Sequence, residues 1–281
     1  AAPVLDPIGN KSVLEGNELR FTINGSDGDV PAQALVYSAA GLPQGAAFDP
    51  ATREFVWTPN HTQGSTSYNV TFSLSDGLVT TSEAITITVT EVNQPPILNL
   101  IGNKTGSEGS LLTFQASVAD ADVPAQIVTY SLENGLGGAV PVGASIDSTS
   151  GVFSWAPTEA QGPSTYTFDV VATDNGSPAL SDRETITVTV NEVNLAPGLS
   201  VPVAVSGDEQ TLLTFTAVVT DGDLPANQFT FSLQGTVPTG ASIDPVSGVF
   251  SWTPTEAQGP GAYDITVRVT DNGIPNAFIE Q

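Results

Sequence analysis

The sequence predicts an all-β protein: three tandem antiparallel β-sandwiches arranged end to end, the third lacking its last strand. Three observations predict this fold. The chain aligns with itself in three copies, apolar residues alternate with polar ones over short stretches, and Gly, Pro, Asn and Asp separate these stretches. The copies are whole domains, because solenoid units recur every ~20 to 50 residues.

Three tryptophans mark the repeat. Trp57, Trp155 and Trp252 stand 98 and 97 residues apart, and the segment Ser154–Pro163 (SWAPTEAQGP) recurs as Ser251–Pro260 (SWTPTEAQGP). Because each Trp lies inside an alternating stretch at the same place in every repeat, we predict a core residue with a satisfied indole N–H and not a sugar-stacking platform. The predicted domains are residues 1–94, 95–195 and 196–281.

The strands of each repeat are predicted from apolar residues that recur every second position. Tyr68, Val70, Phe72 and Leu74 fall on one face of such a stretch. This period of two indicates half-buried strands with one solvated face. No segment has the 3.6-residue period of a helix. Each repeat is therefore predicted to be an antiparallel sandwich of roughly seven strands.

The third repeat is shorter than the second at its end. Gln281 aligns with Glu184, so the strand residues Ile186, Val188 and Val190 of repeat 2 have no counterpart. A sandwich without that strand exposes an apolar groove and unpaired backbone groups. Two explanations stay open: the chain is a piece of a longer array, or a neighbouring subunit supplies the strand, as in donor-strand filaments.

The charge of the chain is strongly acidic. It holds 30 Asp and Glu against 6 Lys and Arg, a net charge of −24. Such a surface repels nucleic acid and anionic membranes and attracts cations. No apolar run is long enough to predict a membrane span in this segment.

The residue inventory also excludes most enzyme chemistry. The chain has no cysteine, which excludes disulfides, thiolate metal sites and cysteine nucleophiles. Its single histidine, His61, has no nucleophile motif around it and is predicted to be an exposed loop residue. Acidic residues that recur in every repeat fit structural ions better than one catalytic cleft. We therefore predict a protein that is not an enzyme.

One long motif resembles a known family. Residues 41–52, continuing to Trp57-Thr58-Pro59, resemble the "LPxGxxfDpxTGxfxWTP" stretch of cadherin-like, dystroglycan-type domains, which are also described as immunoglobulin-like. The stretch recurs in Val140–Pro157 and Val237–Pro254, so the resemblance covers essentially the whole chain. It implies seven-stranded Greek-key sandwiches of bacterial or archaeal surface proteins, an extracellular or cell-surface location, and calcium ions at the junctions between domains.

The resemblance also implies which residues bind calcium. The family's early Glu matches Glu15, Glu108 and Glu209, and its linker motif is matched in part by Glu91-Val92-Asn93 and Glu192-Val193-Asn194. A third element matches Glu159 in repeat 2 but is His61-Thr62-Gln63 in repeat 1. The full candidate set is Glu15, Asp27, Asp29, Asp76, Glu91, Asn93, Glu108, Asp120, Asp122, Glu159, Asp174, Glu192, Asn194, Asp221, Asp223 and Asp271.

The linkers depart from the family pattern. They are one residue shorter than in cadherins, and Gln94 or Leu195 stands where the family has a second Asp. We therefore expect one or two calcium ions at each junction instead of three.

The chemistry of the side chains favours calcium independently of the resemblance. Calcium takes six to eight hard oxygen ligands from carboxylates, amides and backbone carbonyls. Convergent carboxylates repel one another, and a divalent cation reverses that cost. Asp and Asn are also common in turns without any ion. The recurrence of three separate acidic elements in all three repeats favours the metal interpretation.

The sequence thus predicts a calcium-stiffened spacer or stalk of a cell-surface or secreted protein, with an adhesive or structural role. Its expected partners are calcium ions and neighbouring domains of a longer array. The alternative is a subunit of an extracellular filament, whose partners are identical subunits. A ligand-binding adhesin or an accessory module of a carbohydrate-active enzyme would need an exposed aromatic row unique to one repeat, and the sequence has none.

Overall fold

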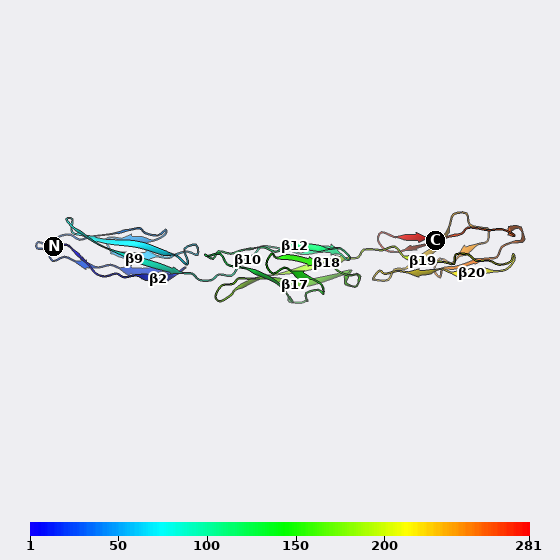
Figure 1. Cartoon of the computed structure of the whole chain (residues 1–281), viewed down its shortest axis with the longest axis horizontal. Coiled ribbons are helices and arrows are strands. Elements are labelled where there is room, and N and C mark those ends of the chain that lie inside the picture. Colours follow the sequence, from blue (N-terminus) through cyan, green and yellow to red (C-terminus); the bar gives the residue numbers. More distant parts are fainter.

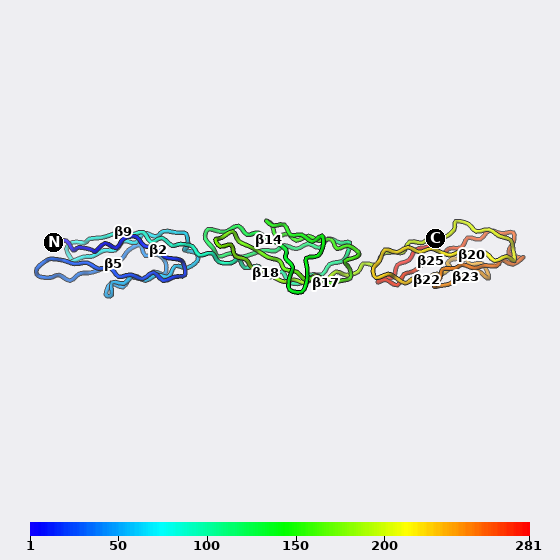
Figure 2. The backbone as a smooth tube through the Cα atoms, turned by 90° about the horizontal axis from the view of Figure 1, so that it is seen from below, coloured from blue at the N-terminus to red at the C-terminus, as the bar shows by residue number.

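The computed structural model describes all residues, 1–281, as three β-sandwiches in an elongated row. Each sandwich is joined to the next by one short linker, and no strand pairs with a strand of another repeat (Figures 1 and 2). Its only helices are two short 3-10 turns, so no helix is long enough to cross a membrane. The predicted all-β class and end-to-end arrangement are confirmed.

Repeat 1 is built from two facing sheets. A four-stranded sheet has the order β2-β9-β8-β5 and a three-stranded sheet the order β3-β7-β6, while β1 pairs with β4. The strand β9 pairs parallel with β2 and antiparallel with β8. The strands are β1 (Val4–Leu5), β2 (Lys11–Leu14), β3 (Leu19–Thr22), β4 (Gly25–Ser26), β5 (Val36–Ala40), β6 (Ala47–Asp49), β7 (Glu54–Trp57), β8 (Ser67–Ser75) and β9 (Thr80–Thr90).

Repeat 2 copies this topology, with the sheets β11-β18-β17-β14 and β12-β16-β15 and the pair β10-β13. Each complete repeat thus has nine strands instead of the roughly seven predicted, because two-stranded pairs such as β10-β13 add short strands to the two main sheets. The strands of repeat 2 are β10 (Ile97–Leu98), β11 (Lys104–Ser107), β12 (Leu112–Gln115), β13 (Val118–Ala119), β14 (Thr129–Glu133), β15 (Ser145–Ile146), β16 (Val152–Trp155), β17 (Ser164–Thr173) and β18 (Ser181–Asn191).

Repeat 3 keeps the sheet β20-β24-β23 and the pair β19-β21, but its other sheet has only β22-β25-β26. No strand corresponds to β2 or β11. The strands are β19 (Gly198–Ser200), β20 (Leu213–Thr216), β21 (Val218–Thr220), β22 (Phe229–Gln234), β23 (Ser242–Ile243), β24 (Val249–Trp252), β25 (Thr266–Asp271) and β26 (Phe278–Glu280).

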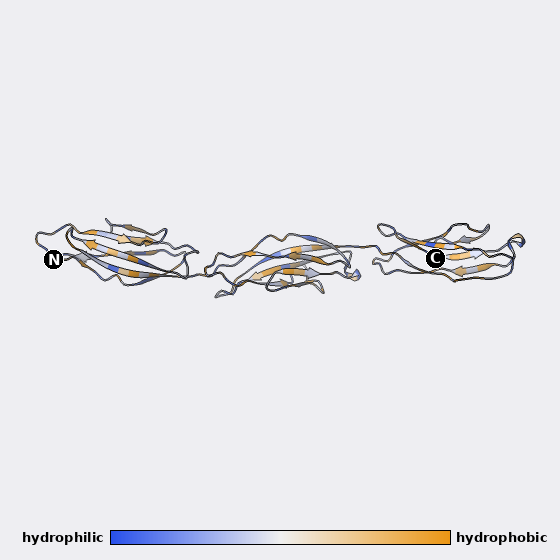
Figure 3. Ribbon diagram, turned by 45° about the horizontal axis from the view of Figure 1, so that its top comes forward, coloured by the Kyte–Doolittle hydropathy of each residue, from blue (hydrophilic) through white to orange (hydrophobic).

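Each repeat has its own apolar core between its two sheets (Figure 3). Val70, Phe72 and Leu74 on β8 are completely buried, as their alternation predicts. Polar residues between them face outward, because successive side chains of a strand point to opposite faces.

The three tryptophans are core residues, as predicted. Each is at most 7% exposed, and each meets a tyrosine edge-on, as Trp57 does Tyr68 at 5.1 Å between ring centroids. The indole N–H of Trp57 donates to the Gln44 carbonyl at 3.1 Å. The indole N–H of Trp155 has no acceptor, so the predicted satisfied N–H fails in repeat 2.

The third sandwich is open where its last strand stops. The strand β26 begins at the position of β18 and pairs with β25, but the chain ends at Gln281, inside the span of the sandwich (Figure 1). The prediction that repeat 3 lacks its last strand is thereby refined. The first part of this strand is present as β26, and only the part that would carry counterparts of Ile186, Val188 and Val190 is absent. A cavity of about 980 Å³ lies there, lined by Leu213, Phe215, Trp252, Tyr263 and Val267 among others.

Candidate metal centres at the domain junctions

Junction 1, between repeats 1 and 2, brings together carboxylates from three separate segments. Glu15 follows β2, Glu91 opens the linker, and Asp122 lies in the loop after β13. One oxygen of each lies within 4.8 Å of the others. The ligand candidates therefore belong to both repeats and to the linker between them.

The carboxylates of junction 1 are largely buried, and each has one oxygen without a partner. Glu15 is 3% exposed and Asp122 is 4% exposed. The Glu15 Oε2, Glu91 Oε1 and Asp122 Oδ1 atoms have no hydrogen-bond partner. Burial, together with the charges of Asp122 and Glu15, raises the pKa of the Glu91 carboxyl. A carboxyl group in this position is costly to ionise unless a cation is present.

A glycine makes room for the early glutamate in each repeat. A Cβ atom on Gly64 would overlap with the Glu15 carboxylate, and one on Gly162 would overlap with the Glu108 carboxylate. Gly259 stands in the same relation to Glu209. Close packing against this loop therefore holds the early Glu at the end of its repeat.

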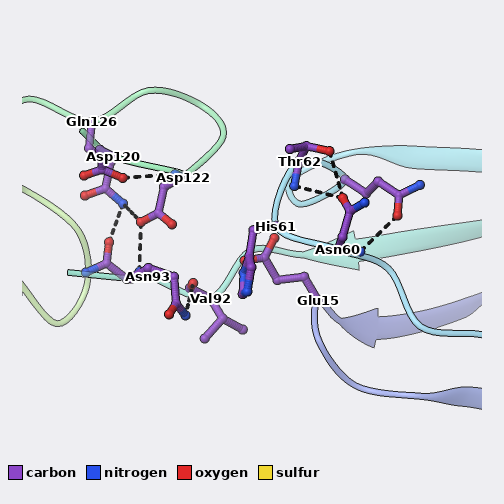
Figure 4. A network of polar contacts seen from close by, with 11 residues as sticks. Glu15, Asn60, His61, Thr62, Val92, Asn93, Asp120, Asp122 and Gln126 are labelled. Atoms are coloured by element: carbon purple, nitrogen blue, oxygen red, sulfur yellow. Dashed lines mark hydrogen bonds and ion pairs between the residues drawn. The ribbon is translucent and has the colours of Figure 1, made fainter. Parts of the chain in front are cut away.

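The second half of junction 1 is an Asp-x-Asp turn. The Asp122 amide donates to Asp120 Oδ1 at 3.0 Å, and the linker amide of Gln94 donates to Asp122 Oδ2 at 2.9 Å. Figure 4 shows Asp120 and Asp122 on one side of the linker and Glu15 on the other. The turn thus ties the linker to repeat 2 and leaves Asp120 Oδ2 buried without a partner.

Asn93 connects the linker to the late aspartate. Its Nδ2 donates to Asp174 Oδ2 at 3.1 Å and to the Pro178 carbonyl at 2.9 Å. Burial would raise the pKa of Asp174, but hydrogen bonds from the Leu180 and Gly176 amides bring that pKa below its usual value. A Cβ atom on Gly176 would overlap with the Asn93 amide, so this loop position requires glycine.

Junction 2, between repeats 2 and 3, has its own carboxylate cluster. Oxygens of Glu108, Glu159 and Glu192 lie within 4.8 Å of one another. Burial, together with the charges of Glu108 and Glu159, raises the pKa of Glu192 to about 7. Glu159 Oε1 also accepts a hydrogen bond from the Leu224 amide of repeat 3 at 2.8 Å.

The half of junction 2 that belongs to repeat 3 has the same hydrogen bonds as the half of junction 1 that belongs to repeat 2. The Asp223 amide donates to Asp221 Oδ1 at 2.9 Å, and the linker amide of Leu195 donates to Asp223 Oδ2 at 3.1 Å. Asn194 Nδ2 donates to Asp271 Oδ1 at 3.1 Å. Burial, assisted by the neighbouring charge of Asp221, raises the pKa of Asp223 although the Leu195 amide opposes this.

Three predicted residues lie at neither junction. Asp27, Asp29 and Asp76 form a cluster of their own at the N-terminal end of repeat 1, where the Ala1 amino group pairs with Asp29. Hydrogen bonds from the Val79 and Leu78 amides lower the pKa of Asp76.

Sequence reasoning missed two amide side chains at the junctions. Gln126 Nε2 contacts Asn93 Oδ1 and donates to Asp122 Oδ2 at 2.7 Å (Figure 4). Asn227 takes the same place at junction 2, donating to Asn194 Oδ1 at 2.9 Å and Asp223 Oδ2 at 2.7 Å. The signal that could have found them is a recurring D-x-D-x-P-A-Q/N segment.

The loop around His61 also contributes to junction 1. His61 is exposed, as predicted, but its Nδ1 lies 2.9 Å from Glu15 Oε1 (Figure 4). Its place in the family motif was visible in the sequence, but its contact with Glu15 depends on how the loop after β7 packs on the turn after β2.

The donor set fits a hard divalent cation. Carboxylate oxygens without partners point into both junctions, including those of Glu15, Asp122, Glu108, Glu192 and Asp221. Buried polar atoms are otherwise almost always hydrogen-bonded. Carboxylate and amide oxygens are the ligands calcium prefers, whereas the junctions offer no thiolate for softer metals.

Comparisons with known proteins agree with this fold. The family described as "Putative Ig domain" matches residues 2–90, 95–191 and 196–277. Human Protocadherin Fat 1 is 29% identical over 212 residues, which is 70% of this chain and 5% of that protein. Protocadherin-16 of Rattus norvegicus is 30% identical over 210 residues, 69% of this chain and 6% of that protein. The chain thus spans only a small part of these relatives.

Solved structures share the row of sandwiches. The crystal structure of human CDH23 EC21-23 has a TM-score of 0.62 at 21% identity, covering 100% of this chain and 99% of that one. Mouse Cadherin-23 EC22-24 has a TM-score of 0.56 at 21% identity, covering 99% and 96%. At this identity the likeness concerns the fold.

Proposed function

This chain belongs to the "Putative Ig domain" family, and on that premise we propose that it is a calcium-rigidified spacer or stalk of a cell-surface or secreted protein. It is a non-enzymatic extracellular module of cadherin-like repeats, with a structural or adhesive role. Calcium ions and the adjoining domains of a longer array are its proposed partners.

The observation that carries this proposal is the buried carboxylate cluster at each junction. Without a cation, three carboxylates within 4.8 Å of one another repel one another at each junction. With a cation, the same groups link one repeat, the linker and the next repeat. Interfaces between domains in one chain otherwise leave relative motion as the default.

The residues that would hold calcium fall into two sets at each junction. At junction 1 they are Glu15, Glu91 and Asp122, followed by Asn93, Asp120, Asp122 and Asp174. At junction 2 they are Glu108, Glu159, Glu192 and Asp223, followed by Asn194, Asp221, Asp223 and Asp271. Calcium would supply the positive charge that neutralises these groups and coordination bonds that fix the angle between repeats.

Small-angle X-ray scattering and calorimetry of the 281-residue chain test the proposal. Calcium should narrow the distribution of particle shapes toward an extended rod and raise the melting temperature, and EDTA should reverse both. Asp122→Asn should weaken the response at junction 1. The matched control is Asp6→Asn, because Asp6 is an exposed aspartate away from both junctions. Identical scattering and melting in calcium and EDTA would rule the proposal out.

A second candidate function rests on the open groove of repeat 3. A cavity of about 980 Å³ lies where β18 lies in repeat 2, so a strand from an identical subunit could complete the sandwich. Sedimentation across a wide range of chain concentration distinguishes this candidate. Filament assembly predicts growing oligomers that disappear when the missing strand is appended to the chain. A monomer at every concentration, with an intact third repeat, contradicts it.

A further inference from the structure

The two junctions differ at one position of the same loop. His61 in repeat 1 and Glu159 in repeat 2 each stand four residues after the core tryptophan. The loops share their internal hydrogen bonding: the Asn60 amide donates to Gln63 Oε1 at 3.0 Å, and the Thr158 amide donates to Gln161 Oε1 at 2.9 Å. The two loops thus share this turn, although only residues Glu159–Gln161 form a 3-10 helix.

At junction 2 this position supplies a carboxylate that contacts both repeats. Glu159 lies within 4.8 Å of Glu108 and Glu192, and it accepts the Leu224 amide of repeat 3 at 2.8 Å. Asp223, the counterpart of Asp122, adds a fourth carboxylate from across the linker: the charge of Glu159 helps to raise the pKa of Asp223, and the charge of Asp223 helps to raise the pKa of Glu192.

At junction 1 the same position holds His61 instead of a glutamate, and the His61 side chain contacts the Glu15 carboxylate. His61 Nδ1 lies 2.9 Å from Glu15 Oε1, whereas the equivalent Glu108 Oε1 accepts the Val193 amide at 2.9 Å, so the early glutamate has one partnered oxygen at each junction. The remaining cluster is Glu15, Glu91 and Asp122, and its unpartnered buried oxygens are one from each. The His61 side chain is 46% exposed, and Figure 4 shows it beside Glu15.

We propose that the two junctions load calcium at different concentrations, with junction 2 binding more tightly and junction 1 serving as the hinge of the chain. The proposal rests on the proposed function, because it concerns the same clusters. Calcium affinity follows the number of charged ligands and the rigidity of the site. One carboxylate fewer within ~5 Å of a divalent ion weakens binding by on the order of tenfold, even with the screening of water.

The consequence is a chain with two mechanical states below saturation. Between the two loading concentrations, repeats 2 and 3 form one rigid unit while repeat 1 swings about residues 91–96. Above both concentrations the whole chain is a rod. His61 would thus set the calcium concentration at which junction 1 becomes rigid and the whole chain becomes a rod.

Single-molecule FRET on the full chain can follow each junction separately. The chain has no cysteine, so two introduced cysteines take the dyes without competition. Ala51→Cys with Thr149→Cys spans junction 1, and Thr149→Cys with Val246→Cys spans junction 2; all three positions are exposed loop residues. The width of the FRET distribution is recorded while calcium is titrated from EDTA to saturation.

We expect two midpoints, with junction 2 narrowing at a calcium concentration about tenfold lower than junction 1. His61→Glu should bring the junction 1 midpoint down to that of junction 2, and Glu159→His should move junction 2 the opposite way. The matched control is Glu256→His, at the equivalent loop of repeat 3 and outside both junctions, which should change neither midpoint.

Two outcomes would overturn the inference while leaving calcium binding in place: equal midpoints in the unmodified chain, or an unchanged junction 1 midpoint in His61→Glu. If neither junction responds to calcium at all, the proposed function itself fails. Unchanged circular dichroism in each variant confirms that a shifted midpoint does not come from a misfolded repeat.

Discussion

At the scale of single residues, polar side chains do much of the positioning that strands cannot. Glu83 on β9 accepts the amides of Ile8 and Gly9, both at 2.9 Å, and so holds the bend between β1 and β2 on the sandwich. Glu184 does the same in repeat 2 for Ile101 and Gly102. A bend that leaves two backbone amides without a ladder partner needs such an acceptor.

Glu83→Gln should lower the free energy of unfolding of repeat 1 by about 1–2 kcal/mol at pH 7, because hydrogen bonds to a charged acceptor are the stronger kind. The Gly9 and Ile8 amides lower the pKa of Glu83 below its usual 4.5. This stabilisation is therefore present above pH ~4.5 and is lost as the pH falls through the lowered pKa. Urea unfolding at pH 7 and pH 3 measures it.

The matched control is Glu133→Gln, since Glu133 forms only a surface pair with Arg183 at 3.4 Å. That change should cost no more than about 1 kcal/mol. An equal loss in both variants, or a Glu83 effect that persists at pH 3, would contradict the role given to Glu83.

At the scale of elements, the last strand of each complete repeat is an inner strand of the four-stranded sheet. The strand β9 joins β2 on one side and β8 on the other, and its inward residues Ile85, Ile87 and Val89 are at most 1% exposed. Residues between them face solvent. One strand thus closes the four-stranded sheet and fills the core.

Ile87→Ala should destabilise repeat 1 by about 2–5 kcal/mol, because it leaves a cavity in a close-packed core. Thr90→Ala, on the exposed face of the same strand, is the control and should change stability by less than about 0.5 kcal/mol. Chemical denaturation followed by tryptophan fluorescence compares the two. A small effect of Ile87→Ala would mean that β9 is not the closing strand of the core.

At the scale of the whole molecule, the three sandwiches are unequal. They contain 12, 10 and 6 buried apolar residues in chain order. The decline in repeat 3 follows from its last strand, because residues 261–265, which correspond to the start of β17, form no strand once their partner is absent. The domain limits predicted at residues 94/95 and 195/196 stay predictions.

We expect repeat 3 to unfold at the lowest temperature in a calorimetric scan of the chain with calcium present. Appending the sequence of residues 185–192 after Gln281 should raise that transition alone, because it restores the inward residues Ile186, Val188 and Val190. The control is an appended segment of the same composition with the alternation broken. Equal stabilisation by both segments would contradict the strand-completion account.

The sequence by itself determined what repeats locally. Alternation at every second position places Val70, Phe72 and Leu74 inside, and the spacing of the tryptophans sets three copies of one core. Both follow from the geometry of a strand, in which neighbouring side chains point to opposite faces. The acidic motifs could also be identified from the sequence, because they recur at similar positions relative to the strands of each repeat.

Only the tertiary structure decided which side chains meet. Glu15 and Asp122 are far apart along the chain, and their convergence depends on the linker and on two loops that pack across it. The same packing brings His61 into contact with Glu15 and Gln126 into contact with Asn93. It also leaves the Trp155 indole N–H without an acceptor. Loops carry no periodic pattern, so their contacts follow from the assembled sandwiches and not from residue spacing.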